Sequence, residues 1–440
     1  MNYGNFMSKV KTNLHEKVSK AILFSVITFS AAQLAPAAYA TSLDTSFGTG
    51  GKVTTDFFGA TNANYSTIVD SNGKIVAAGS AIDSGTLKFA LARYLTNGTL
   101  DTAFGTGGKV TLSNAADPYG ITSIMEQADG KYVAVGTSKV TANKSTTALI
   151  RFNTDGSLDT TFGTGGITIV AAIGNLIPLA ATLDSQERIV FTGGYRNSIF
   201  VARFTTTGAP DTTFSQNGIV RTKQANGADS YARAIGIDST GKIVVAGFVA
   251  ASPGFTWIVQ RYKKSGKLDT TFNTTGQMTV PFPASTSNIA NALALKSDDS
   301  IYVGGSAQVG TDNLALVHVL ANGTFDTSFG TSGFTILDPM PGFGAASSIR
   351  AMKLDANGDI IGMGSVAYNS TGGEFVAMRF TTAGALDTTF ASPTGFQMVK
   401  FGTDNNLVSS VAIQTDGKIV GGGYIFDGSK YLFAVLRIIP

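Results

Sequence analysis

Short stretches of apolar and β-branched residues alternate with turns along most of this chain, and they recur in the same order. Residues 109–112 form one such stretch, and residues 121–127 and 131–136 flank an Asp-Gly pair that favours a tight hairpin turn. A further stretch, such as residues 89–94, ends in arginine and an aromatic residue. Stretches this short and rich in β-branched residues predict a repeating unit of four β-strands.

Each unit contains one copy of a six-residue motif, so the number of copies gives the number of units. Its first copy reads Leu-Asp-Thr-Ser-Phe-Gly at Leu43–Gly48, and the later copies keep the aspartate and the phenylalanine. Successive aspartates are 57, 58, 52, 58, 57 and 61 residues apart. The aspartates are Asp44, Asp101, Asp159, Asp211, Asp269, Asp326 and Asp387, and the phenylalanines are Phe47, Phe104, Phe162, Phe214, Phe272, Phe329 and Phe390.

Seven such units predict an all-β fold, a seven-bladed β-propeller with four antiparallel strands per blade. The two ends of the repeat region favour a closed ring over a linear solenoid. The first unit begins with a fourth strand only, at residues 51–55, and the chain stops after a third strand, at residues 431–438. We therefore expect residues 44–57 to pair with residues 404–440 and complete the seventh blade.

The first 40 residues have the pattern of an export signal. Lysines precede an apolar run at residues 21–29, and Ala38-Tyr39-Ala40 fits a cleavage site. A membrane anchor is the less favoured alternative, because the run is shorter than the roughly 20 residues of a transmembrane helix. We expect a signal peptide at 1–40 and a propeller at 41–440 that is secreted or periplasmic, with no stable membrane span after cleavage.

Charge and composition exclude several classes of function. The net charge of +3 comes from 32 Lys+Arg against 29 Asp+Glu, and the excess lies in the first 40 residues, so nucleic acid is not an expected partner. Cysteine is absent, which excludes disulfides, thiolate catalysis and cysteine-based zinc sites. One of the two histidines, His15, lies in the signal segment. We expect no cofactor, no metal site and no catalytic residues.

Two motifs carry a resemblance to a known family. Leu158–Gly166 reads Leu-Asp-Thr-Thr-Phe-Gly-Thr-Gly-Gly, and Asp416–Val420 reads Asp-Gly-Lys-Ile-Val. Over residues 42–440 the chain resembles the delta-60 repeat family, bacterial β-propeller repeats of generally unknown function. The resemblance implies a propeller and supplies no catalytic residues. Two local departures are residues 184–187, which lack the hairpin glycine, and Pro210, which replaces the motif leucine.

The third strand ends in arginine in six units, and the next motif aspartate lies eight residues later. Because an unpaired buried guanidinium is costly, we predict structural Arg–Asp pairs in preference to six ligand sites. In the remaining unit His318 takes the arginine position. Trp257 lies four residues before Arg261, in a register of core residues, so we expect it in the core. The predicted pairs are Arg93–Asp101, Arg151–Asp159, Arg203–Asp211, Arg261–Asp269, Arg379–Asp387 and, by ring closure, Arg437–Asp44.

If the strands of a unit are called A to D, the D–A and B–C connections share one face of the blade, and the A–B and C–D turns share the other. The turns are nearly uniform between units, whereas the connections vary, as at 138–146, 248–255 and 368–374. Variable connections on a rigid scaffold are the usual place for binding. The candidate binding residues on this face are Tyr119, Tyr231, Phe255, Phe343 and Tyr368.

Two functions remain open at this point. The first is a binding or scaffolding module for a protein or glycan. The alternative is a metal-dependent hydrolase or lactonase with its site in the central channel, which would need inward carboxylates or amides from several A strands. Those strands offer few acids, and their polar residues include Thr67, Ser123, Thr182 and Asn291. The sequence therefore favours binding over catalysis.

Overall fold

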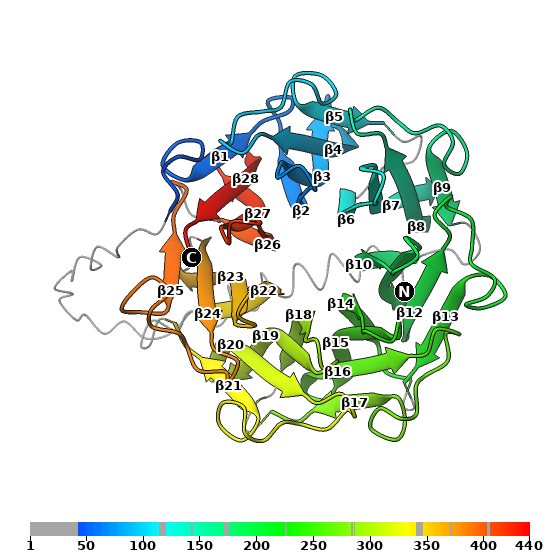
Figure 1. Cartoon of the computed structure of the whole chain (residues 1–440), viewed down its shortest axis with the longest axis vertical. Helices are drawn as coiled ribbons and strands as arrows, with labels where there is room; N and C mark the ends of the chain where they lie inside the picture. Colours follow the sequence, from blue (N-terminus) through cyan, green and yellow to red (C-terminus); the bar gives the residue numbers. More distant parts are fainter. Residues whose placement is uncertain are drawn as a thin grey trace.

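The computed structural model describes residues 43–113, 120–141, 144–170, 176–224, 227–282, 285, 287–339, 346–369, 372–402 and 405–440. These residues form seven four-stranded antiparallel sheets arranged as the blades of a ring (Figure 1). Within each sheet the strands run from the centre of the ring outward in the order A, B, C, D. The predicted seven-bladed all-β propeller is confirmed.

The strand bounds follow the repeat closely. The blades consist of β2 (Asn62–Val69), β3 (Ile75–Asp83), β4 (Thr86–Tyr94) and β5 (Lys109–Leu112); β6 (Gly120–Glu126), β7 (Tyr132–Thr141), β8 (Lys144–Phe152) and β9 (Ile167–Val170); β10 (Ile177–Leu183), β11 (Ile189–Tyr195), β12 (Ser198–Phe204) and β13 (Ile219–Lys223); β14 (Ser230–Ile237), β15 (Ile243–Ala251), β16 (Gly254–Tyr262) and β17 (Gln277–Val280); β18 (Asn288–Leu295), β19 (Ile301–Val309), β20 (Thr311–Val319) and β21 (Phe334–Leu337); β22 (Ala346–Leu354), β23 (Ile360–Asn369), β24 (Gly372–Phe380) and β25 (Phe396–Val399); and β26 (Leu407–Ile413), β27 (Ile419–Phe426), β28 (Tyr431–Ile438) and β1 (Lys52–Thr55).

The seventh blade closes the ring with both ends of the repeat region. Its sheet has the order β1-β28-β27-β26, so the first described strand supplies the outer edge. β1 pairs antiparallel with β28, with Val53 opposite Val435, and Leu43 forms a bridge with Ile438. This closure satisfies the edge of β28, which would otherwise expose unpaired backbone groups.

The segments expected as variable B–C loops are mostly strand. β7 continues to Thr141 and β8 begins at Lys144, and in the fourth blade Ala251 pairs with Gly254 at the hairpin end. The described part of 368–374 likewise belongs to β23 and β24. Backbone pairing continues to the hairpin end because it needs no particular side chain, so variable sequence here did not mean a loop.

Every innermost strand carries a β-bulge at the same place. In β2, Asn64 lies opposite Gly79 and Ser66 opposite Ala78, which leaves Tyr65 without a partner on β3. The pairing of the other six innermost strands shifts at the corresponding residue. Such a bulge changes the direction in which the side chain of the unpaired residue points. The seven bulged residues are Tyr65, Thr122, Leu179, Arg233, Asn291, Arg350 and Ser409.

Aromatic side chains fill the space between blades. All seven motif phenylalanines are buried, with exposures of 0–1%. Trp257 is fully buried as well, and its Nε1 donates to the Ser306 carbonyl of the next blade at 3.1 Å. The expected core position of Trp257 is therefore observed, and the indole is unavailable for stacking on a ligand.

Candidate functional site

The arginine at the end of each third strand lies beside the aspartate that opens the next motif. In all six predicted pairs the arginine Nε donates to an aspartate Oδ2 at 2.7–2.9 Å. Five pairs are buried and the Arg379–Asp387 pair is partly exposed. Because the pair recurs in the same place, it serves the framework of the blade.

Each of these arginines also stacks on the motif phenylalanine and in four blades bonds to the next blade. The guanidinium of Arg93 lies 4.5 Å from the ring centroid of Phe104, and its Nη1 donates to the Thr154 carbonyl in the following C–D turn. Arg151, Arg261 and Arg437 make the corresponding bond. The side chain therefore fixes the strand end, the motif and the neighbouring blade together.

A second cation shares the aspartate in five blades, and sequence reasoning missed it. Lys74, which follows the A–B turn, lies 2.7 Å from Asp101 Oδ2. The signal was the lysine of the Asp-Gly-Lys string, which stands at a constant place in the hairpin. The equivalent pairs are Lys131–Asp159, Arg188–Asp211, Lys242–Asp269 and Lys418–Asp44.

The blade with His318 keeps the same arrangement with other groups. His318 Nδ1 lies 2.8 Å from Asp326 Oδ2, and its Nε2 lies 2.9 Å from Ser300 Oγ. Ser300 stands where the other blades place the lysine. His318 thus makes framework contacts at both ring nitrogens.

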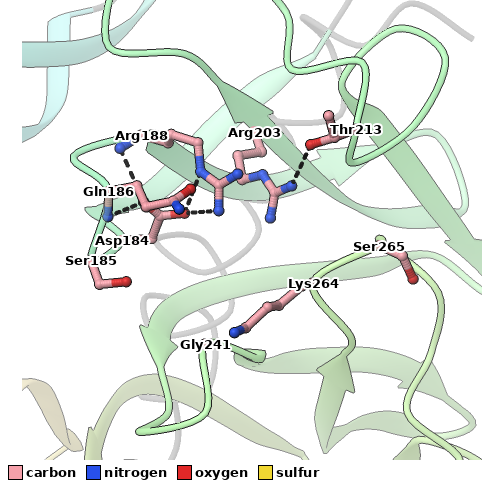
Figure 2. Close-up of a pocket in the computed structure, with 9 residues that line it drawn as sticks. All are labelled: Asp184, Ser185, Gln186, Arg188, Arg203, Thr213, Gly241, Lys264 and Ser265. Carbon is pink, nitrogen blue, oxygen red and sulfur yellow. Dashed lines mark hydrogen bonds and ion pairs between the residues drawn. The ribbon is translucent and has the colours of Figure 1, made fainter.

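The turn face holds a small polar pocket between the third and fourth blades (Figure 2). Its lining includes Arg188, Arg203 and Lys264, and both arginines bond to Asp211 at 3.1 and 2.7 Å. Lys264 lies across the pocket beside Gly241 (Figure 2). The two guanidiniums are already neutralised, so this pocket repeats the framework contacts rather than adding a separate site.

Two of the candidate binding residues form an aromatic cluster at the B–C end of the fourth blade. Tyr231 stacks on Phe248 with centroids 5.3 Å apart, and Phe255 meets Phe248 edge-on at 5.0 Å. Tyr231 is only 6% exposed and packs against Gly194 of the preceding blade. Phe255 is half-buried and offers a ligand more surface than Tyr231 does.

The remaining candidates are placed less fully. Tyr119 and Phe343 lie outside the described residues. Tyr368 belongs to β23, but its side chain is not described. A binding role for these three residues, and for Tyr231 and Phe255, stays a prediction.

The four polar residues expected on the innermost strands bond either to a neighbouring blade or within their own strand. Ser123 Oγ accepts from the backbone N–H of Ala181 at 3.0 Å, and Asn291 lies between Arg233 and Ser348. Thr67 bonds within its strand to Asn64, and Thr182 to the carbonyl of Leu183. The described residues hold no group of three or more His, Cys, Asp and Glu side chains that could bind a metal ion.

In the part of the chain that the structure describes, no helix has the length and hydrophobicity of a transmembrane span.

Four segments match a family model described as a domain of unknown function (DUF5122) beta-propeller, at residues 71–104, 127–162, 239–272 and 296–329. Each segment runs from the A–B turn of a blade to the next motif phenylalanine. The match identifies β-propeller repeats whose function is unknown. No curated protein matches the chain in sequence.

Solved structures resemble the fold at low sequence identity. A streptogramin B lyase has a TM-score of 0.48 and 12% identity, over 88% of this chain and 97% of its own. Sqt1 from Chaetomium thermophilum has a TM-score of 0.46 and 12% identity, over 87% of this chain and 98% of its own. A protein of unknown function from Dyadobacter fermentans has a TM-score of 0.47 and 14% identity, over 88% of this chain and 98% of its own. Such distant likeness carries no functional information about this chain.

Proposed function

We propose that this protein is an exported binding or scaffolding module that recognises a protein or glycan with the face formed by its D–A and B–C connections, here called the connection face. The observation that carries the proposal is the difference between the two faces of the ring. One face repeats the same contacts in blade after blade, whereas the other changes from blade to blade.

The turn face is uniform down to its backbone hydrogen bonds. In the first blade Asp70 N–H donates to the Lys74 carbonyl and Gly73 N–H donates to the Asp70 carbonyl, and all seven A–B turns repeat this pair of bonds. In the third and fifth blades Glu187 and Asp299 keep the turn with φ of 60° and 64°, where the other five blades have glycine. A surface held constant despite sequence change serves the fold.

The connection face differs in each blade where it is described. The first blade has an ion pair between Lys88 and Asp83 at 2.6 Å, the fourth has the aromatic cluster around Phe248, and the seventh joins Lys430 to Asp56 at 2.5 Å. Non-repeating charges and aromatic groups on a rigid ring can present a specific surface to one partner.

The test measures thermal unfolding of residues 41–440 against a panel of neutral glycans, with two surface variants. Thr86→Glu adds a charge to the connection face and Ser265→Glu adds one to the turn face; both residues are exposed. A ligand that binds only the folded state raises the midpoint. We expect a glycan-dependent rise that Ser265→Glu retains and that Thr86→Glu, combined with Phe255→Ala, reduces.

A rise that survives the connection-face variant but disappears with Ser265→Glu would contradict the assignment of the face. If no glycan raises the midpoint, the same two variants are compared for crosslinking to purified envelope proteins. A midpoint that depends on a divalent metal and falls with EDTA would instead support the alternative of a metal-dependent hydrolase or lactonase.

A further inference from the structure

Two arginines near the centre of the ring lack the partner that the chain supplies to its other enclosed arginines. Among the described residues, seven arginines that are not exposed form ion pairs with aspartate. Arg233 and Arg350 are also half-buried, yet no described carboxylate lies within 4.0 Å of either guanidinium. We call these two residues the axial arginine pair.

The bulges bring the axial arginine pair onto neighbouring innermost strands. Arg233 is the bulged residue of β14, Asn291 that of β18 and Arg350 that of β22, and these strands lie in sequence around the centre (Figure 1). Arg233 Nη1 donates to Asn291 Oδ1 at 2.9 Å. Asn291 Nδ2 donates in turn to Ser348 Oγ at 2.8 Å and to the Ile349 carbonyl at 3.1 Å. Asn291 therefore holds one arginine against the strand that carries the other.

The electrostatic environment of the pair is unfavourable for two cations. Burial, and then the positive charge of Arg350, lower the pKa of Arg233 to about 10. Burial also lowers the pKa of Arg350, and its Nε is enclosed without a hydrogen-bond partner. Lys353, three residues further along β22, is a third cation, and the protein around it lowers its pKa although its side chain reaches solvent.

Nearby acidic groups do not resolve this imbalance. The negative charge of Asp312 partly offsets the effect of burial on the pKa of Arg350, but Asp312 forms no ion pair with it. Burial raises the pKa of Tyr424 to about 12, so its phenol is neutral at neutral pH and supplies no counter-charge. Burial also raises the pKa of Asp312, and the positive charge of Arg350 opposes that rise without forming an ion pair. An enclosed cation without a carboxylate is costly, and among the described residues the other enclosed arginines avoid this cost by pairing with aspartate.

We propose that the axial arginine pair is a binding site for an oxyanion, namely a carboxylate or phosphate group carried by a ligand small enough to reach the centre of the ring. Guanidinium groups bind such oxyanions through paired N–H donors in a fixed geometry. The site does not rest on the connection-face proposal, because both arginines lie on innermost strands. The guanidinium of Arg233 does lie 5.2 Å from the ring centroid of Phe248, so this arginine adjoins the aromatic cluster of the fourth blade.

Two probes distinguish the sources of the oxyanion. Thermal unfolding of the full mature protein is measured with sodium glucuronate and with inorganic phosphate, against sodium chloride at equal ionic strength. We expect at least one probe to raise the midpoint saturably, on the order of a few degrees, because it binds only the folded ring. A response to glucuronate alone assigns a carboxylate ligand, and a response to phosphate alone assigns a phosphate ligand.

Two variants locate the effect. Arg350→Met and Arg233→Met should each abolish the rise, and Arg350→Met without ligand should unfold no earlier than the wild type, because it removes an unpaired enclosed charge. Arg221→Met is the matched control: Arg221 is exposed on the outer strand β13, with its guanidinium 4.8 Å from the Tyr195 ring centroid. This variant should respond as the wild type does.

The proposal is overturned if neither probe raises the midpoint above the chloride control, or if both axial variants keep the full response. Calorimetric titration of the unmodified protein is a second measurement that does not depend on the folding of any variant. Saturable heat is expected with at least one probe, and the absence of heat with both probes contradicts the site.

Discussion

Asp44 illustrates how the motif aspartates remain ionised although most of them are buried in the folded blade. Burial opposes ionisation, but hydrogen bonds from Ser46 and the positive charge of Arg437 outweigh it and lower the pKa of Asp44 to about 2. The pKa of Asp211, Asp269 and Asp387 is lowered as well. The native state therefore binds fewer protons than the unfolded chain at acidic pH, which couples stability to pH.

Asp44→Asn tests this coupling. The pKa of Asp44 in the folded state lies below the unfolded value of about 3.9. The carboxylate therefore makes its full contribution to the free energy of unfolding above pH ~4, and this contribution is lost as the pH falls toward 2. We expect the variant to be less stable by about 2 kcal/mol at pH 7, the usual contribution of hydrogen bonds to a charged group. Its stability should also fall less steeply between pH ~4 and ~2 in urea unfolding.

Asp129→Asn is the control, because Asp129 is exposed in an A–B turn and its amide replacement can still accept the Lys131 N–H. This control should follow the wild-type pH profile. An Asp44→Asn profile as steep as that of the wild type would show that other groups govern the acid transition.

At the scale of elements, the C–D turn both reverses the chain and packs against the preceding blade. Gly156 has a φ of 87°, and a Cβ there would lie 2.8 Å from Val110 and 2.9 Å from Phe104. Gly165, just before β9, has a φ of 61° and no atom within 4 Å of the same position. A substitution at Gly165 would therefore meet only the backbone strain of a positive φ, whereas one at Gly156 would meet this strain and close packing as well.

Gly156→Ala should therefore be more destabilising than Gly165→Ala. The left-handed backbone alone costs alanine about 1–2 kcal/mol, which is the full expectation for Gly165→Ala. Overpacking adds about 1–3 kcal/mol at Gly156. Urea unfolding measures the free energy of unfolding of both variants. Equal losses of this free energy would mean that the blades separate enough to admit a methyl group.

The B–C hairpins show where sequence variability misled at this scale. Residues 248–255 vary between units and were expected to form a loop, yet Phe248 pairs with Trp257 and Ala250 with Phe255. The strand persists because its backbone bonds do not depend on which side chains it carries. The variable surface at these hairpins is therefore made of strand ends.

At the scale of the molecule, the ring is held shut by the segment that begins the repeat region. Phe47 is fully buried, Asp44 neutralises Arg437, and β1 covers the edge of β28. Residues 43–55 thus contribute core, charge and backbone pairing to a blade whose other strands lie at the far end of the chain.

A protein that begins at residue 58 tests the closure against one that begins at residue 42. Without β1, the edge of β28 and the pocket of Phe47 are open, and Arg437 loses its carboxylate. We expect a lower unfolding midpoint in calorimetry and concentration-dependent association in light scattering, because an open edge recruits other strands. A shortened protein that stays monomeric with an unchanged midpoint would refute the importance of closure.

The fold was predictable because the same four-strand unit, with the same motif, occurs seven times in the sequence. Aspartate and phenylalanine at a constant period, hairpin turns and complementary ends together determine the blade count and the closure. The Arg–Asp pairs followed from the eight-residue spacing, which spans one tight turn between antiparallel strands. The lysine that shares the aspartate was missed because it comes from a different hairpin and reaches the carboxylate only in the folded blade.

Contacts between blades were decided by the tertiary structure alone. Tyr231 was expected at a binding surface, but Gly194 of the preceding blade leaves it room to be buried. The sequence by itself determined the architecture, because periodic residues specify one blade and its repetition. Only the tertiary structure joined Arg233 through Asn291 to the strand that carries Arg350, and left these two guanidiniums without a carboxylate among the described residues. The reason is that pairing across blades depends on the bulge geometry and on the side chains of each neighbouring strand.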